Sequence, residues 1–164
     1  MCIRDRVITQ NLKKVGIKTN VRTYDFGAWI ARMQKGDFEM AIGWADKGST
    51  PYNFFKSMMF SGYVKPIGET ADLNWHRFGL EEADLLFKEF EQTSDEKTIK
   101  IIISKLQHLF IENAPGIPLF AELSWAESNS KYFTNFPSEQ NPYGPLSVNE
   151  QPSFIFTLLN VKKR

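Results

Sequence analysis

The alternation of apolar and polar residues over the first 44 positions predicts two helices and two strands. Apolar residues recur at helical spacing in two stretches and at every second position in two others, which gives the order helix 7–15, strand 17–24, helix 26–34, strand 38–44. Gly16 is placed to end the first helix in the left-handed conformation, and Asp25 to cap the second. Two strands joined by a helix are expected to run parallel, with a right-handed crossover.

The pattern after position 50 is mainly helical and then becomes irregular. Helices are predicted over 52–60, 80–92 and 94–113. Thr93 and Glu96 have the spacing of a capping box, which makes Thr93 the expected N-cap of the last of these helices. The stretches 116–123 and 154–159 are apolar and strand-like, and the segment between them is mostly polar, with several prolines.

These elements are divided unevenly along the chain. Residues 7–120 have the order of an α/β domain, whereas residues 121–164 hold too few elements to form a core alone. Residues 1–6 match nothing that follows and resemble an artefactual leader on a truncated reading frame. We therefore expect the chain to be part of a longer protein, and residues 1–6 enter no functional argument.

Composition and charge exclude several classes of function. The chain has 164 residues, of which 42% are hydrophobic and 24% charged, as in a globular domain. Its net charge of +1 gives no electrostatic footprint for nucleic acid or for an anionic membrane. No apolar run approaches the roughly 20 residues that a membrane helix needs. Cys2 is the only cysteine, so no intramolecular disulfide can form.

The segment after the second predicted strand is the first candidate site, because α/β sheets bind ligands at the carboxyl ends of their strands. Residues 43–49 superficially resemble a phosphate-binding loop, but Ser49 stands where that motif needs lysine, and Pro51 interrupts the helix entry. His76 and His108 lie far apart, and no metal-ligand spacing exists. A nucleophile motif is also lacking. We expect no catalytic residue, no metal and no cofactor.

Aromatic and hydrogen-bonding residues gather in two of the predicted loops. Trp44 ends the second strand, and the sequence Asn-Trp-His-Arg-Phe at 74–78 lies in a long irregular segment. Planar rings beside amide, imidazole and guanidinium groups are typical of a surface that stacks on a ligand and bonds its hydroxyls. Trp44 and Trp75 fit stacking and core packing equally well. His76 and Arg77 fit either ligand binding or the anchoring of their loop.

Several short motifs occur in the order and spacing of a known family. They are Val15-Gly16-Ile17, the turn Gly36–Met40, Trp44 with Pro51 and Asn53-Phe54-Phe55, the segment Asn113–Phe120, and the final stretch leading to Val161-Lys162. Together they resemble the carboxyl-terminal part of the family 5 extracellular solute-binding proteins of ABC transporters, the dipeptide- and oligopeptide-binding type. The resemblance runs from about Val7 to Lys163.

This resemblance implies an α/β fold with two lobes, the type II periplasmic-binding-protein fold, with the ligand held between the lobes. Residues 7–120 would supply most of the second lobe, and residues 121–164 would cross the hinge and return to the first lobe, whose body is absent. The resemblance also implies a monomer in the periplasm or on the outer face of the cytoplasmic membrane. It would meet the membrane only through the permease subunits of its transporter, and an export signal would lie upstream.

One departure from the family pattern concerns the ligand. In the dipeptide binders, an acid between the tryptophan and the proline pairs with the amino terminus of the peptide. Lys47 holds that place here, and a lysine repels an ammonium group. Asp46 could substitute only if the loop shifts. Residues 74–78 and 138–143 are similar to the branch of the family that binds oligosaccharides such as cellobiose.

The expected function is that of the substrate-binding component of an ABC importer, which captures a cellobiose-like oligosaccharide for transmembrane transport. Trp44 and Trp75 would stack on the ligand. The expected polar contacts come from Asp46, Lys47, Asn74, His76 and Arg77. An oligopeptide or dipeptide ligand is the alternative within the same family, and a carbohydrate-active enzyme is the alternative of another class.

Overall fold

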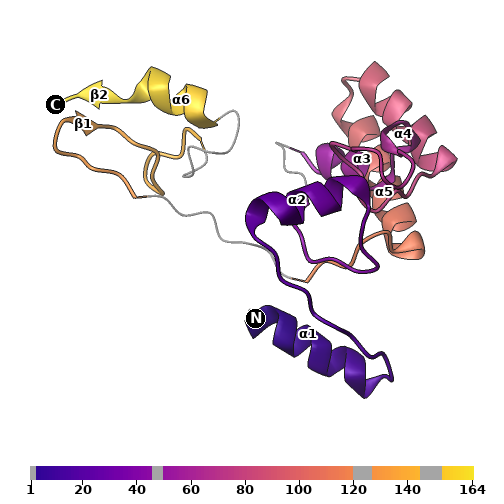
Figure 1. Cartoon of the computed structure of the whole chain (residues 1–164). Coiled ribbons are helices and arrows are strands. Elements are labelled where there is room, and N and C mark those ends of the chain that lie inside the picture. The colour runs from indigo at the N-terminus through magenta and orange to yellow at the C-terminus, as the bar shows by residue number, and fades with distance from the viewer. Residues whose placement is uncertain (1–2, 46–49, 120–126, 145–152) are drawn as a thin grey trace. The chain divides into compact units, whose positions relative to one another are not determined.

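The computed structural model of the chain describes residues 3–45, 50–119, 127–144 and 153–164. The chain divides into two compact units, Met1–Pro115 and Gly116–Arg164. The first unit contains α1 (Ile3–Lys14), α2 (Phe26–Lys35), α3 (Tyr52–Met59), the short 3-10 helix η1 (Ser61–Tyr63), α4 (Glu81–Gln92) and α5 (Glu96–Asn113) (Figure 1). The second contains β1 (Phe133–Thr134), α6 (Ser153–Asn160) and β2 (Lys162–Lys163).

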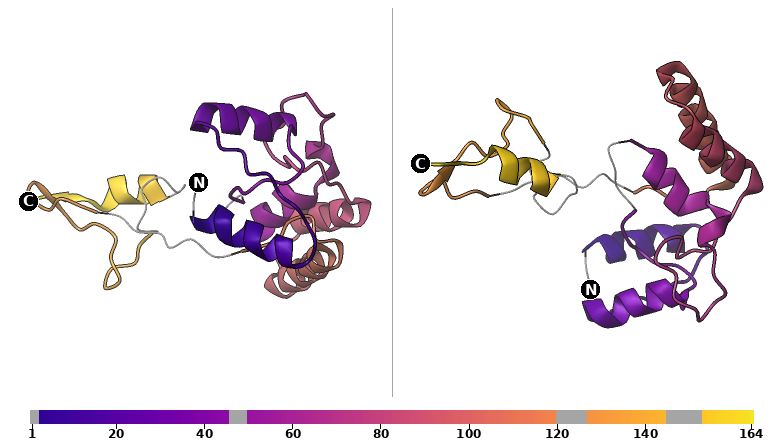
Figure 2. Two further views of the ribbon diagram at one scale, coloured as in Figure 1. Left: turned by 60° about the horizontal axis from the view of Figure 1, so that its bottom comes forward. Right: turned by 90° about the horizontal axis from the view of Figure 1, so that it is seen from above.

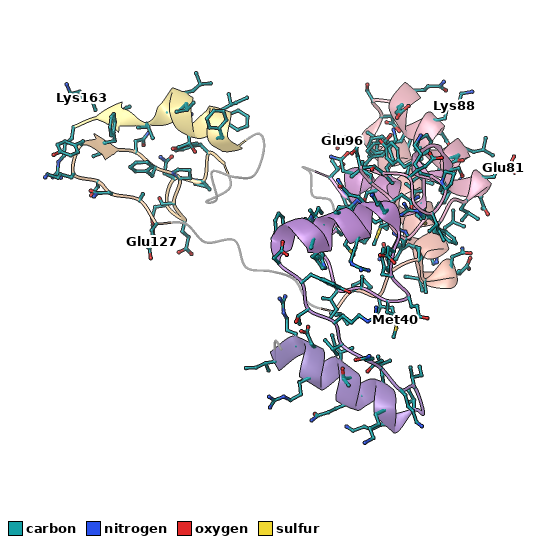
Figure 3. All side chains as sticks on the ribbon, viewed as in Figure 1. Met40, Glu81, Lys88, Glu96, Glu127 and Lys163 are labelled. Carbon is teal, nitrogen blue, oxygen red and sulfur yellow. The ribbon has the colours of Figure 1, made fainter. Side chains whose placement is uncertain are left out.

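The helices α3, α4 and α5 enclose the hydrophobic core of the first unit, and they lie together in every view (Figures 1 and 2). Their side chains fill the space between the ribbons (Figure 3). The largest fully buried side chains are Met59, Phe87, Ile102 and Leu106. Full burial of a side chain of this size contributes roughly 1.5–3 kcal/mol, so this three-helix core supplies much of the stability of the unit.

Specific residues end the helices, mostly as the sequence predicts. The carboxylate of Asp25 accepts a hydrogen bond from the amide of Ala28 at the start of α2, and Gly36 ends that helix with φ 69°. The predicted N-cap of α5 is wrong by two residues. Asp95 caps the helix by accepting from the amide of Thr98, while the Thr93 hydroxyl accepts from the amide of Asp95.

The two strands predicted over 17–24 and 38–44 are not present, and part of the predicted strand 116–123 lies outside the described residues. Residues 17–24 and 38–44 contain no strand, so the expected parallel pair with its crossover is wrong within the described residues. An alternating stretch becomes a strand only when a neighbour pairs with its backbone. The predicted strand 154–159 is helix α6 instead. Its continuous apolar run has no period that separates strand from helix.

In the second unit, Asn135 hydrogen-bonds to two separate segments of the chain. Strands β1 and β2 pair antiparallel, with Phe133 opposite Lys163. Asn135 follows β1 with φ 66°; its side-chain amide donates to the carbonyl of Asn160 at 2.7 Å, and its own carbonyl accepts from the Tyr143 hydroxyl at 2.7 Å. This residue therefore ties the end of β1 to the end of α6. None of the described helices is both long enough and apolar enough to cross a bilayer.

Candidate functional site

Aromatic rings from three parts of the sequence meet beside α2, and we call this group the aromatic surface. Its members are Phe26, Trp29, Trp44 and Trp75. Phe26 and Trp29 are three positions apart on α2 and therefore share a face of the helix. Trp44 belongs to the segment 41–45, which is neither helix nor strand, and Trp75 lies in the loop between η1 and α4. The structure thus brings together the two tryptophans that the sequence places at the site.

The rings of the aromatic surface contact one another at distances typical of favourable aromatic pairs. The Trp44 centroid lies 4.9 Å from that of Trp29 and 5.7 Å from that of Trp75, whose ring stands nearly edge-on at 79°. Phe26 lies 6.2 Å from Trp44, and the two rings are close to parallel at 16°. Each ring is therefore supported from the side by its neighbours.

Two members of the aromatic surface are open to solvent. Phe26 is 68% exposed and Trp44 is 55% exposed, whereas Trp29 and Trp75 are partly buried. Large apolar side chains that are exposed next to one another mark binding surfaces. Sequence reasoning missed Phe26. The signal that could have found it is its position three residues before Trp29 on an amphipathic helix.

The turn at 74–77 carries the remaining described candidate residues. The amide of Arg77 donates to the carbonyl of Asn74 at 2.9 Å, and both residues are left-handed, with φ of 57° and 53°. Asn74 is only 3% exposed. Its side-chain amide donates to the carbonyls of Phe60 and Phe78, and its side-chain oxygen accepts from the amide of Phe78. Every polar group of this side chain is thus bonded to the backbone.

Arg77 connects its loop to the end of α2. Its guanidinium donates to the carbonyl of Trp75 at 2.5 Å, to that of Gln34 at 2.8 Å and to that of Glu69 at 2.9 Å. Gln34 belongs to the last turn of α2, whose carbonyls have no partner within the helix. The loop amides of Gly68 and Ala71 also donate to carbonyls of this turn. The arginine and the loop together cap the helix.

His76 is held against α3. Its Nε2 lies 2.8 Å from the carbonyl oxygen of Met58, and since a carbonyl only accepts, Nε2 carries the proton. Burial and the nearby positive charge of Arg77 lower the pKa of His76, and the hydrogen bond to Met58 opposes them in part. The imidazole therefore favours its neutral form, which can still accept a proton or a hydrogen bond at Nδ1.

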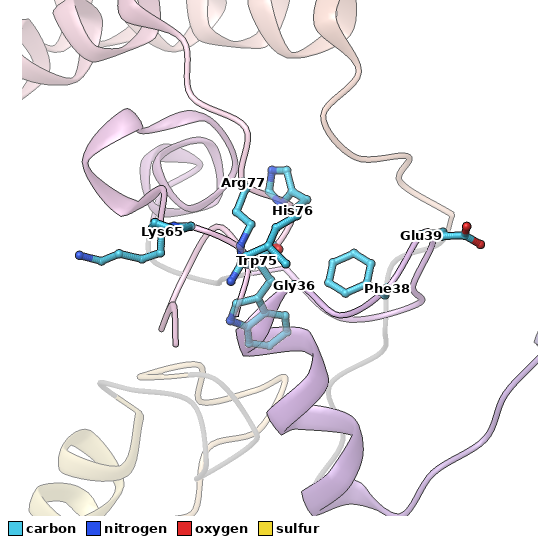
Figure 4. Close-up of a pocket in the computed structure, with 9 residues that line it drawn as sticks. Gly36, Phe38, Glu39, Lys65, Trp75, His76 and Arg77 are labelled. Carbon is cyan, nitrogen blue, oxygen red and sulfur yellow. Dashed lines mark hydrogen bonds between the residues drawn. The ribbon is translucent and has the colours of Figure 1, made fainter. Parts of the chain in front are cut away.

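A cavity of about 450 Å³ is lined in part by the loop that carries Trp75 (Figure 4). Its lining combines the turn after α2 with two parts of the loop: Gly36, Phe38, Glu39, Lys65, Pro66, Ile67, Trp75, His76 and Arg77. The charged side chains of Glu39 and Lys65 point away from Trp75 in opposite directions. The space near the ring is therefore bounded mainly by apolar groups.

Two predicted site residues, Asp46 and Lys47, lie outside the described residues. Among the described residues, no group of three or more His, Cys, Asp or Glu side chains is arranged to hold a metal ion. The arrangement around Trp44 and Trp75 offers ring faces and edges to a ligand. It offers no described pair of side chains placed for proton transfer to one.

Comparison with known proteins finds similar sequences among bacterial binding proteins. No protein-family profile matches the chain. It is 26% identical to di/tripeptide-binding protein 1 of Pseudomonas aeruginosa over 65% of its own length, and 25% identical to heme-binding protein A of Haemophilus influenzae over 73%. It spans about a fifth of these curated relatives, 19% and 21% of their length.

Solved structures of periplasmic binding proteins share its fold. A periplasmic oligopeptide-binding protein of an ABC transporter from Thermotoga maritima, with mannohexaose bound, matches 99% of this chain with a TM-score of 0.78 at 22% identity. The match covers 31% of that protein. An ABC transporter-associated periplasmic binding protein from Helicobacter pylori, in complex with the peptide STSA, matches 70% of the chain and 22% of its own, with a TM-score of 0.60 and 25% identity.

The solved structures and the di/tripeptide-binding relatives that the chain matches are family 5 solute-binding proteins of ABC transporters. The resemblance found in the sequence is thereby confirmed. The fold class is confirmed too, since the chain matches part of a periplasmic-binding-protein fold, although its described residues contain little sheet. The family 5 relatives named above are binding proteins.

Proposed function

We propose that the protein containing this chain is the solute-binding component of an ABC importer and that the aromatic surface contacts the ligand. The observation that carries the proposal is the meeting of the partly exposed Trp44 with Trp75 at 5.7 Å. Similarity to known proteins supports the transport role, because the relatives of known structure are periplasmic proteins of ABC transporters. The protein then works outside the cytoplasmic membrane as a monomer and delivers its ligand to permease subunits.

The mechanism follows from the two-lobed fold. This chain supplies most of one lobe and the segment that returns to the other, so the aromatic surface forms one wall of the cleft. Ligand that contacts both walls stabilises the closed form, because only the closed form makes both sets of contacts. Closure also removes Phe26 and Trp44 from water, which adds a hydrophobic contribution to binding.

An oligosaccharide is the ligand that we propose. Ring faces favour the apolar faces of sugars, and Lys47 at the place of the acid disfavours the charged amino end of a peptide. The relative with mannohexaose bound supports a sugar. The relatives named for di- and tripeptides support the alternative, a short peptide. Asp46 and Lys47 follow Trp44 directly and offer polar contacts to either ligand.

In this proposal Asn74 and Arg77 shape the loop and do not bind the ligand directly. The side-chain groups of Asn74 are all bonded to the backbone, and Arg77 donates to carbonyls of three residues. Trp44 and Trp75 therefore carry the direct contact. His76 retains Nδ1 as an acceptor for a ligand hydroxyl, and Asn74 and Arg77 act mainly through the shape of the loop.

The test is a titration of the 164-residue chain labelled with 5-fluorotryptophan, followed by fluorine NMR, which detects weak contacts to one wall. Mannohexaose and cellohexaose should shift the Trp44 and Trp75 signals, and a tetrapeptide should shift them less. Trp75→Ala should weaken sugar binding about tenfold or more, as loss of a central tryptophan does in other interfaces. Ile101→Ala, exposed on α5, is the control. If no sugar and no peptide moves either signal, the proposed site is wrong.

A charge change separates the two ligand classes. Lys47→Asp restores an acid at the position where the family's dipeptide binders carry one. We expect it to increase the response to the tetrapeptide, because its ammonium group then meets a carboxylate. An unchanged peptide response would remove Lys47 from the explanation of ligand choice.

A further inference from the structure

We propose that Arg77 and Asn74 are positioning residues that hold the Trp75 ring in the aromatic surface, and that Gly36 provides the space for the Arg77 guanidinium. The consequence for affinity rests on the proposed function. The positioning itself is a statement about the free chain and can be tested without a ligand.

Arg77 connects Trp75 to the preceding part of the loop and to α2. One carbonyl that it bonds belongs to Trp75 itself, another to Gln34 on α2, and the last to Glu69 in the preceding part of the loop. A planar guanidinium with several donors can satisfy carbonyls in different directions at once, whereas a lysine ammonium on its flexible stem cannot reproduce that fork. The backbone of Trp75 is thereby tied to the helix that carries Phe26 and Trp29.

Gly36 leaves the space that the Arg77 guanidinium occupies. A Cβ at position 36 would lie 2.6 Å from Arg77 Cζ, 2.7 Å from its Nη1 and 2.8 Å from its Nε. A Cβ carbon essentially never comes this close to a non-bonded atom, so any side chain at position 36 must displace the guanidinium. The left-handed φ of 69° at Gly36 adds strain for residues other than glycine. Gly36 thus both ends α2 and leaves room for the Arg77 guanidinium.

Asn74 holds the turn from the α3 side. Its amide donates to the carbonyl of Phe60, just after α3, at 3.2 Å, and to that of Phe78 at 2.6 Å. Its side-chain oxygen accepts from the amide of Phe78 at 3.0 Å. Asparagine tolerates the left-handed conformation better than most residues, which suits its φ of 53°. The turn is therefore fixed to α3 by Asn74 and to α2 by Arg77.

Trp75 lies in the sequence between Asn74, which is bonded to the segment after α3, and Arg77, which is bonded to α2. Its indole Nε1 donates to the carbonyl of Asp72 at 3.0 Å, so the polar edge is occupied within the loop. The rest of the ring meets Trp29 at 6.1 Å and 87° and Trp44 at 5.7 Å and 79°. A ring fixed before binding loses less conformational entropy when a ligand arrives, so its pre-organisation increases affinity.

Fluorine NMR of the ligand-free chain labelled with 5-fluorotryptophan tests the positioning. The Trp75 and Trp44 signals are assigned by Trp75→Phe and Trp44→Phe. Arg77→Lys keeps the positive charge but loses the planar set of donors that bonds several carbonyls at once. Gly36→Ala keeps the arginine but fills the space that its guanidinium occupies. Both should move or broaden the Trp75 signal. In the sugar titration, each should weaken binding about threefold to tenfold, the effect of freeing one side chain.

Gly16→Ala is the matched control. Gly16 is also left-handed after a helix, with φ 86°, but a Cβ there meets nothing within 4 Å. The same backbone strain without the arginine contact should leave the Trp75 signal in place. The proposal is overturned if Arg77→Lys and Gly36→Ala both leave that signal unchanged, or if Gly16→Ala moves it equally.

Two further outcomes remain decisive. Circular dichroism should show that the helices persist in both variants, because the α3–α5 core does not include Arg77 or Gly36. Loss of all helical signal in either variant would overturn a role limited to positioning. A Trp75 signal that responds as expected, without any sugar response in the unmodified chain, would keep the positioning role and reject the proposed function.

Discussion

Two aromatic-rich regions of the first unit use their rings in opposite ways. In the α3–α5 core, Phe55, Phe87 and Phe110 are 6%, 1% and 7% exposed. In the aromatic surface, Phe26 and Trp44 are 68% and 55% exposed. The core rings are held by the packing of three helices against one another. The rings of the surface come from one helix and two loop segments, and Arg77 connects its loop to that helix. The same residue types are thus buried in the core in one region and exposed to solvent in the other.

The largest expected difference between the regions comes from deleting one ring in each. Phe87→Ala removes a fully buried ring and should lower the free energy of unfolding by about 3–5 kcal/mol. Trp44→Ala removes a ring that is more than half exposed and should cost under about 1 kcal/mol. Urea denaturation followed by circular dichroism at 222 nm measures both. Equal losses would show that Trp44 is part of the core, and the distinction between the regions would fail.

A smaller effect is expected from the left-handed residues of the two regions. Ala114 ends α5 with φ 44° and is exposed. Ala114→Gly should therefore stabilise the chain by about 1 kcal/mol, since glycine adopts this conformation without strain. Arg77 has φ 57°, but its guanidinium bonds three carbonyls, so Arg77→Gly should destabilise despite the same relief.

Thermal unfolding of both glycine variants tests this contrast. Ala31→Gly, in the exposed middle of α2, is the control for glycine in ordinary helix and should destabilise by about 1 kcal/mol. If Arg77→Gly raised the melting temperature as Ala114→Gly does, the hydrogen bonds of Arg77 would contribute less than the backbone strain.

The smallest expected effect is a pH dependence confined to the loop. The pKa of His76 is lowered by burial and by Arg77, so the unfolded loop takes up a proton more readily than the folded loop. Its contribution to stability is complete above the unfolded pKa of about 6.5 and is lost as the pH falls toward the folded pKa. Amide hydrogen exchange of residues 74–78 between pH 8 and pH 5, corrected for intrinsic rates, measures the change.

His76→Gln should abolish this dependence, and His108→Gln, on the exposed face of α5, should leave it unchanged. A loss of protection at low pH that spreads equally through the α3–α5 core would assign the titration to other groups.

The helices of the core were predictable because their signals are local. The apolar spacing of 80–92 and 94–113 reflects one buried face each, and the structure places α4 and α5 within two residues of those predictions. The choice of Asp95 over Thr93 as N-cap was not predictable, because both have a side-chain oxygen that can accept from a nearby amide. Small differences in φ and ψ decide between them.

The surroundings of the site were less predictable because they depend on distant partners. The alternation of 17–24 and 38–44 predicts strands, but strand pairing is a property of neighbours, and the described residues supply none. The sequence placed Trp44 and Trp75 in candidate loops and left open whether they stack or pack. It could not reveal that Arg77 reaches the carbonyl of Gln34, because that contact spans 43 positions.

The close approach of the Arg77 guanidinium to Gly36 also restricts which residues can occupy these two positions in evolution. Asparagine is the usual alternative to glycine after a helix, since it tolerates a left-handed backbone. At position 36 its Cβ would collide with the guanidinium all the same. Homologues should therefore vary these two positions in concert: a side chain at 36 becomes acceptable only once 77 has lost its arginine. Such covariation in an alignment would record the contact between α2 and the loop without any structure.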